Sequence, residues 1–145
     1  PGCPNLIDRI ETGLLSHGND MTLENNPIEA GLDRFFKMGK SADYIGREAL
    51  EKIAASKPDM KFVRIVAQGE PISNPRETYS MTAADGQGDG CVTSITYSPR
   101  LKCNVGLGYL AAECANVGRE VAISAADRVI SAHVANNDWA IQPQK

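Results

Sequence analysis

The residues that could do chemistry begin in RIETGLLSHGNDMTLENNPIEAGL, residues 9–32, which carries four carboxylates and one histidine. Glycines and the Asn25-Asn26-Pro27 turn interrupt this stretch, and few of its apolar residues recur at a helical or strand period. Loops with many polar groups at fixed spacing often bind a ligand, although they can also be plain surface. The residue types are suited to binding a cation or a ligand with several hydrogen-bond donors.

A metal site is one candidate for this stretch. His17, Asp20 and Glu24 offer suitable ligands, but the Gly and Asn residues around them oppose the helix that would align them. The four cysteines contain no CxxC pair, and the chain has only two histidines, so we expect no zinc or other metal site. A disulfide framework stays possible. A chain of this size can bury a core without cross-links, however, and a reduced, cytoplasmic setting is favoured.

Glu11 has a different setting, because it stands near the end of a short apolar-periodic segment, just before Gly13. Spacing alone favours a solvated helix end. If the carboxylate were buried, a cationic or bidentate donor would have to offset its desolvation. A second polar loop, YSPRLKCN at residues 97–104, has Arg100 and Lys102 available for an anion, or is simply a charged turn of a barrel.

Three further motifs predict structure rather than chemistry. DGQGDG, residues 85–90, resembles the start of a calcium loop, but Thr96 occupies the position of the bidentate Glu, so we predict a hairpin turn. NVGLGYL lacks the third glycine of a dinucleotide fingerprint, and its glycines, Gly106 and Gly108, are expected to let strands approach closely. His133 is expected to be structural, since no nucleophile or partner lies near it in sequence.

The helices and strands around these residues can be predicted from hydrophobic periodicity. Leu6, Ile7 and Ile10 predict a short helix over residues 5–12, and IGREALEKIAAS predicts a clearer helix over residues 45–56. The segment IEAGLDRFFKM fits neither period. Six β-branched segments separated by turn residues then predict an antiparallel barrel or sandwich. These segments are residues 60–67, 77–83, 91–98, 104–111, 119–125 and 128–135.

Composition excludes several classes of protein. The net charge of −3 and a pI near 5.4 argue against a nucleic-acid surface, because neutralising phosphates needs clustered Lys and Arg. No apolar run approaches the ~20 residues of a membrane span, and no signal peptide is visible. The chain opens on PGCPN without an initiator Met, and we expect it to come from within a longer protein.

Three stretches together resemble the folate-dependent aminomethyltransferase family: residues 9–32, DYIGREAL and VTSITYSPRLKCNVGLGYL. The family includes the T-protein of the glycine cleavage system, the folate domains of dimethylglycine and sarcosine oxidising enzymes, and dimethylsulfoniopropionate demethylase. Its approximate pattern contains R-x-E-x-G, G-x-D-(I/M), P-x-E-x-x-L, F-x-G-R-E-A-L and V-T-S-x-x-x-S-P-x-L. The resemblance covers nearly the whole chain, with the motifs in the same order. The chain is similar to the C-terminal portion of such proteins.

The resemblance implies an α+β fold, with a mixed N-terminal segment followed by a six-stranded antiparallel β-barrel. Residues 1–56 would end the folate-binding domain, and residues 57–145 would form the C-terminal barrel domain. Glu11 matches the family carboxylate that holds the pterin, whose adjacent N–H and amino donors suit a carboxylate. Lys40 stands where the family commonly has a folate-binding Arg, and a lysine lacks the planar fork. The family's C-terminal Tyr is missing, since Trp139 is the only aromatic residue of the tail.

The resemblance further implies a tetrahydrofolate-dependent one-carbon transferase that accepts a methyl or methylene unit from a small amine or sulfonium substrate. The family's key catalytic aspartate lies in an N-terminal half that this chain lacks, so we expect no catalytic residue here and an inactive fragment. The expected partners are the substrate and the N-terminal remainder of the same protein, without nucleic acid or membrane. The alternative is a non-catalytic folate-binding or docking module.

Overall fold

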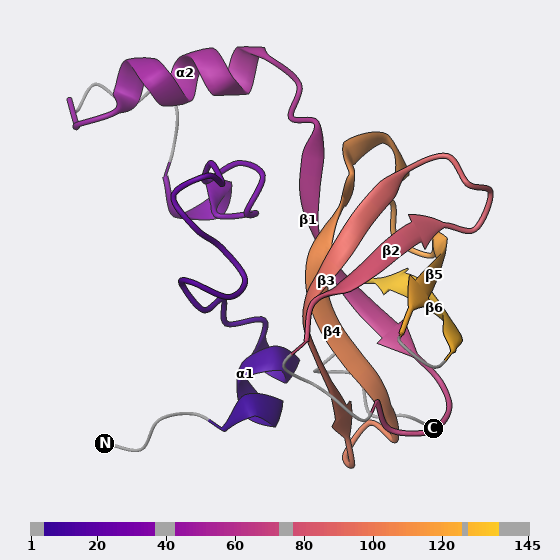
Figure 1. Ribbon diagram of the computed structural model, residues 1–145. Coiled ribbons are helices and arrows are strands. Elements are labelled where there is room, and N and C mark those ends of the chain that lie inside the picture. The colour runs from indigo at the N-terminus through magenta and orange to yellow at the C-terminus, as the bar shows by residue number, and fades with distance from the viewer. Residues whose placement is uncertain (1–4, 37–42, 73–76, 126–127, 137–145) are drawn as a thin grey trace.

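The computed structural model describes residues 5–36, 43–72, 77–125 and 128–136. Within these ranges, two α-helices and two short 3-10 turns accompany six strands, and Figure 1 shows the helices beside the barrel rather than within it. This arrangement confirms the predicted α+β class with a six-stranded antiparallel barrel. The elements are α1 (Leu6–Thr12), η1 (Asp33–Phe35), α2 (Arg47–Ala55), β1 (Met60–Ala67), β2 (Tyr79–Ala83), β3 (Asp89–Ser98), β4 (Cys103–Ala111), η2 (Ala112–Cys114), β5 (Glu120–Ser124) and β6 (Val129–Ala135).

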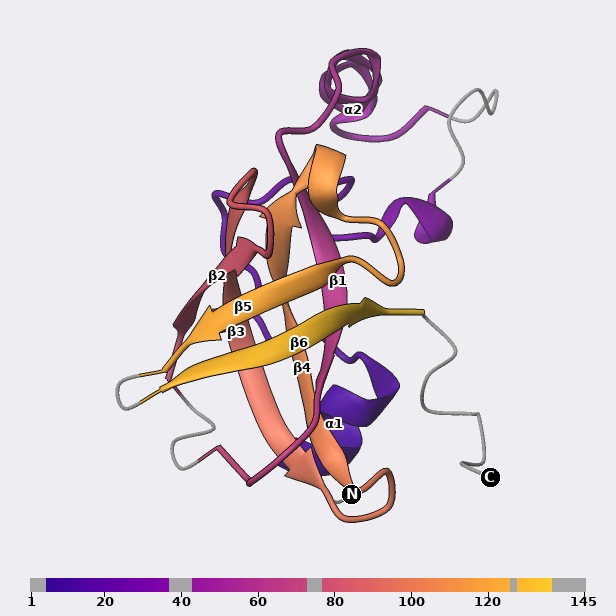
Figure 2. The same cartoon turned by 90° about the vertical axis from the view of Figure 1, so that its right-hand side faces the viewer.

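The strands close in the order β1-β4-β3-β2-β5-β6, and every pairing is antiparallel. The β1–β6 pairing closes the ring, and Figure 2 shows β5 and β6 running side by side across the barrel. Alternate residues of each strand face inward, so Ile65, Ile95 and Ile123 have no exposed surface. Each such side chain contributes roughly 1.5–3 kcal/mol through burial, and together they form the barrel interior.

Glycines in β4 let the strands approach one another closely, as predicted. A Cβ on Gly108 would lie 2.1 Å from the backbone oxygen of Cys91, and a Cβ on Gly90 would lie equally close to that of Tyr109. The β3–β4 register shifts between Val92 and Ser94 beside these contacts. The bulge and the missing side chains together allow the strong bend that a small closed barrel needs.

A second apolar core joins α1 to the outer face of the barrel. Ile10 of α1 is fully buried against the outward side chains of β4, including Val105 and Leu107. The helix begins where the Asn5 side chain accepts a hydrogen bond from the Asp8 amide, and it ends at Gly13 with φ +72°. The cap and the glycine stop are the expected signals for so short a helix, and packing against β4 then stabilises it.

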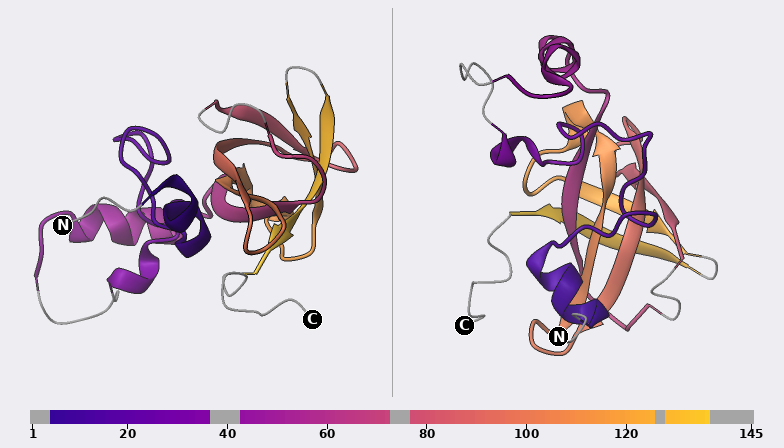
Figure 3. Two further views of the ribbon diagram at one scale, coloured as in Figure 1. Left: turned by 90° about the horizontal axis from the view of Figure 1, so that it is seen from below. Right: turned by 90° about the vertical axis from the view of Figure 1, so that its left-hand side faces the viewer.

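The remaining helix, α2, has no buried residue. It lies away from the barrel in Figures 1 and 3, and an exposed Arg47–Glu51 ion pair is found on its surface. The predicted helix over residues 45–56 is therefore confirmed, although its apolar face is only partly covered. The described part of the ambiguous segment, residues 28–36, forms turns and the 3-10 turn η1. Within the described ranges, no helix has the length and apolar character needed to cross a bilayer.

The motif at residues 85–90 forms the predicted hairpin turn. The Ala83 amide donates to the carbonyl of Gly88 at 2.9 Å, and Gly86 has φ +73°. The Asp85 carboxylate accepts from the Gln87 amide at 3.1 Å and pairs with Arg119, which lowers the Asp85 pKa below its usual value. His133 lies on β6 with an exposed side chain, opposite Glu120 of β5 and Val66 of β1.

Candidate functional site

Glu11 lies in the last turn of α1 and is only 7% exposed. The hydroxyl of Ser98 donates to Oε1 of Glu11, while Arg100 donates to Oε2 through Nε at 2.9 Å and Nη2 at 2.7 Å. Spacing alone favoured a solvated helix end, and this burial shows that interpretation to be wrong. Arg100 belongs to the second polar loop of the sequence, between β3 and β4. The two polar stretches of the sequence are therefore in contact through Glu11 and Arg100.

The acceptor positions left on the Glu11 carboxylate can be compared with the two adjacent hydrogen-bond donors of a pterin. A carboxylate has about four lone-pair positions, and a paired donor group needs one on each oxygen. Oε2 already accepts two bonds from Arg100, whereas Oε1 accepts one from Ser98. Glu11 therefore fits such a group if Arg100 releases one of its bonds. Its role as a pterin-binding residue stays a prediction, and Lys40 and Trp139 lie outside the described residues.

Asp20, which is 1% exposed, has a structural role that its sequence pattern did not predict. It pairs with Arg9 of α1 and accepts hydrogen bonds from the Ser16 amide and the Thr93 hydroxyl, both at 2.8 Å. The hydroxyl of Ser94 donates to the same carboxylate. The network fastens the loop after α1 to β3 at its bulge. The G-x-D-M motif in the sequence contains Asp20. The loop around it has no hydrophobic periodicity, however, so the sequence does not predict which way the Asp20 side chain points.

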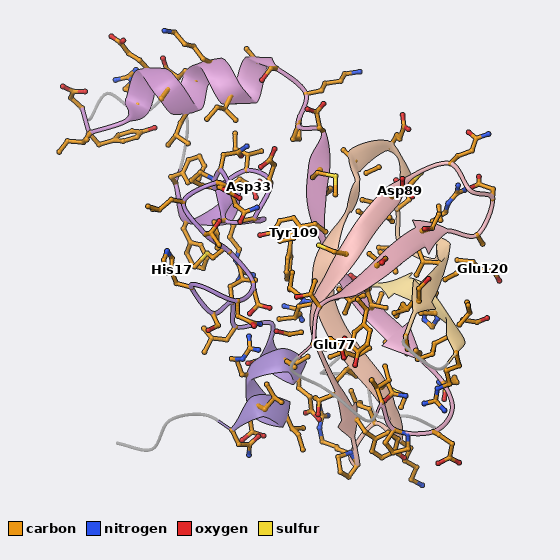
Figure 4. All side chains as sticks on the ribbon, viewed as in Figure 1. His17, Asp33, Glu77, Asp89, Tyr109 and Glu120 are labelled. Carbon is orange, nitrogen blue, oxygen red and sulfur yellow. The ribbon has the colours of Figure 1, made fainter. Side chains whose placement is uncertain are left out.

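His17 and Asp20 are close in sequence, but their side chains point in different directions. His17 is exposed on the side of the N-terminal segment away from the barrel, as Figure 4 shows, whereas Asp20 faces β3. Glu24 is also exposed. Across the described residues, no group of three or more His, Cys, Asp or Glu side chains could hold a metal ion.

A cavity of about 470 Å³ lies between the N-terminal segment and β1. Arg64, only 8% exposed, is part of its wall, and the Arg64 guanidinium donates through Nη2 to the Thr12 carbonyl at 3.3 Å. The cavity is thus next to the end of α1 that carries Glu11. Its lining comprises Gly13, Leu14, Leu15, Met21, Ala30, Gly31, Leu32, Asp33, Arg34, Phe35, Lys61, Phe62 and Arg64.

Tyr109 of β4 lies between the N-terminal segment and the barrel in Figure 4, with its ring edge-on to Phe62 at a centroid distance of 5.9 Å. Its hydroxyl is buried and finds no hydrogen-bond partner among the described residues. Burial, reinforced by the charge of Asp20, raises the pKa of Tyr109 to about 12. Burial and then the nearby Glu11 charge also raise the pKa of the Cys103 thiol.

Comparison with known proteins gives consistent matches. Residues 61–138 match the family model of the glycine cleavage T-protein C-terminal barrel domain. Dimethylsulfoniopropionate demethylase DmdA from Ruegeria pomeroyi is 42% identical over 109 residues, which cover 75% of this chain and 29% of that protein. An aminomethyltransferase from Bacteroides thetaiotaomicron is 36% identical over 126 residues, covering 87% of this chain and 34% of that protein.

A solved structure matches the fold of most of the chain. The glycine cleavage system aminomethyltransferase T from Bartonella henselae superposes with a TM-score of 0.80 at 26% identity, covering 92% of this chain and 37% of that one. The chain thus spans about a third of the length of the proteins that it matches.

Proposed function

The chain belongs to the family of glycine cleavage T-protein C-terminal barrel domains, and we propose that it is part of a tetrahydrofolate-dependent one-carbon transferase. The observation that carries this proposal is the similarity to relatives of two kinds, aminomethyltransferases and a dimethylsulfoniopropionate demethylase. The activities named for these relatives share the removal or transfer of a one-carbon unit. We accordingly propose a small amine or sulfonium as the donor substrate.

We propose that residues 1–56 complete a folate-binding domain and that residues 57–145 form the separate barrel. The exposed apolar side chains of the first part support a further portion of the protein as its partner. Leu23 and Phe35 are 95% and 72% exposed, and Ile45 is fully exposed. Covering such side chains releases ordered water, so each of these exposed residues is suited to packing against a further portion of the protein.

The pterin-holding residue that we propose is Glu11. Tetrahydrofolate, when bound, supplies the amine that accepts the one-carbon unit. The carboxylate of Glu11 orients that cofactor by accepting from its paired donors, and the neighbouring Ser98 fixes the carboxylate in place. Lys40 is proposed as a second cofactor-binding residue on the family resemblance alone. No residue of this chain is proposed as catalytic, and the chain by itself is expected to show no turnover.

The test uses the intact parent protein and calorimetric titration with tetrahydrofolate. Replacing one acceptor oxygen in Glu11→Gln removes a charge-assisted pair, so the dissociation constant should rise at least about tenfold. Glu24→Gln, an exposed carboxylate of the same segment, is the matched control and should bind as wild type. Equal affinity for Glu11→Gln and wild type contradicts the pterin role. Tight binding without turnover of any amine or sulfonium favours the alternative of a non-catalytic folate-binding module instead.

A further inference from the structure

We propose that the cavity beside Arg64 is a carboxylate-binding subsite, with the Arg64 guanidinium as its principal donor. The proposal rests on the proposed function for the identity of the molecule that carries the carboxylate. Its physical basis is the combination of a buried guanidinium, a positively charged lining and a cavity of about 470 Å³. Small-molecule sites commonly enclose roughly 300–1,000 Å³.

The position of Arg64 on β1 directs its side chain out of the barrel toward the N-terminal segment. Its neighbours Val63 and Ile65 belong to the barrel interior, and strand alternation places Arg64 on the opposite face. Removing a guanidinium from water is costly unless strong acceptors surround it. The carbonyl of Thr12 is one such acceptor, and the planar fork of Arg is the side chain best suited to bind a carboxylate with two hydrogen bonds.

Gly13 makes the space for this guanidinium. A Cβ at Gly13 would lie 2.1 Å from Nη2 and 2.5 Å from Cζ of Arg64. The glycine also has φ +72°, which ends α1. One residue thus both ends the helix that carries Glu11 and lets the Arg64 guanidinium lie against the backbone at the cavity wall.

The remaining charges of the lining favour an anion. Arg34 and Lys61 are exposed residues of the wall, and Asp33 is the one acidic residue among those named. Excess positive charge in a concave, partly apolar space attracts anionic ligands. Phe62, backed by Tyr109, supplies an apolar wall for the rest of such a ligand. An organic carboxylate with an apolar or aromatic portion therefore suits this cavity.

Two molecules of the proposed reaction carry such a group. The folate cofactor ends in an aminobenzoylglutamate with carboxylates, and small substrates such as dimethylglycine and dimethylsulfoniopropionate carry one carboxylate each. Both present the same chemistry to Arg64. Four ligand probes separate these sources: folinate, tetrahydrobiopterin, which is a reduced pterin without a carboxylate, dimethylglycine and dimethylsulfoniopropionate.

The experiment measures dissociation constants of these probes for the intact parent protein and its Arg64→Met variant. If the tail is the occupant, the constant for folinate rises at least about tenfold, while that for tetrahydrobiopterin changes less than about twofold. If the substrate is the occupant, the constants for dimethylglycine or dimethylsulfoniopropionate rise instead. Arg128→Met, an exposed arginine that contacts backbone carbonyls at 3.3 Å near Pro71, is the matched control and should leave all constants unchanged.

A purely structural role for Arg64 gives a different result. In that case Arg64→Met lowers the unfolding midpoint without changing any dissociation constant, and the proposal is overturned. Arg64→Lys guards against a misfolded variant, because it retains the charge but loses the fork, and its affinity should fall between those of wild type and Arg64→Met.

If neither folinate nor tetrahydrobiopterin binds wild type, the proposed function fails. Titration with aminobenzoylglutamate alone then still tests the subsite, and equal affinity for wild type and Arg64→Lys overturns it.

Discussion

The guanidinium of Arg9 on α1 pairs with the carboxylate of Asp20, whose side chain has no exposed surface. The same guanidinium donates through Nη2 to the hydroxyl of Ser94 at 2.8 Å, and the Ser94 hydroxyl in turn donates to Asp20. Helix, loop and strand are therefore tied at one point. Because Glu11 and Gly13 lie on the same helix end as Arg9, this pair also fixes the candidate site against the barrel.

Asp20→Asn tests that connection. The substitution leaves Arg9 without its anion and gives the buried position a donor where only acceptors are needed. Stability should fall by about 3 kcal/mol, as expected when a buried ion pair loses one partner. Urea unfolding of the chain measures the loss, and Glu24→Gln in the same loop should change stability by less than about 0.5 kcal/mol. Equal midpoints for Asp20→Asn and wild type would mean that the network adds nothing to folding.

Arg100→Met removes the cation from Glu11. Arg100 is half-exposed and Glu11 is buried, so we expect a loss of about 1–2 kcal/mol, mostly from leaving the carboxylate poorly satisfied. Lys102→Met, in the same loop, removes an exposed charge and serves as control. In a double-mutant cycle with Glu11→Gln, the two losses should be less than additive. Strict additivity would show that the ion pair does not couple the loop to α1.

Gly108→Ala tests the close approach of β3 and β4. A methyl group at Gly108 meets the Cys91 backbone oxygen at 2.1 Å, and a backbone atom cannot move aside cheaply. Gly106→Ala is the comparison, since its nearest contact is 3.1 Å from the Ser94 oxygen. We expect Gly108→Ala to cost about 3 kcal/mol or more and Gly106→Ala clearly less, measured by thermal or urea unfolding. The reverse order would contradict the strand register.

The stability of the fold should depend on pH through Tyr109. Burial raises its folded pKa to about 12 from an ordinary value near 10, so the folded state holds the phenol proton more tightly. The associated stability is complete below about pH 10 and is lost as the pH rises toward about 12. Tyr109→Phe should abolish this component and remove the corresponding tyrosinate absorbance transition. Since the hydroxyl has no partner among the described residues, the variant should be as stable as wild type at pH 7.

Much of the secondary structure was predictable because its signals are local. The strand over residues 60–67 coincides with β1, and the predicted helices overlap α1 and α2 within two residues. Alternation, β-branching, helix caps and glycine stops act within a few residues along the chain. The hairpin at residues 85–90 was predictable for the same reason. The segment with mixed periodicity before α2 was not, since its turns depend on contacts with β1, such as the Phe62 amide donating to the Glu29 carbonyl at 2.7 Å.

The α+β class, the six strands and the motif carrying Glu11 could all be predicted from the sequence, because they follow from local patterns and their order. Which side chains contact one another could be read only from the folded structure. Glu11 contacts Arg100 across 89 positions of sequence, and Asp20 contacts Ser94 across 74. Such pairs form where barrel closure brings the β3–β4 strands and loop against α1, and nothing along the chain encodes that distance. The cavity beside Arg64 has the same origin, since packing of two separate segments creates it.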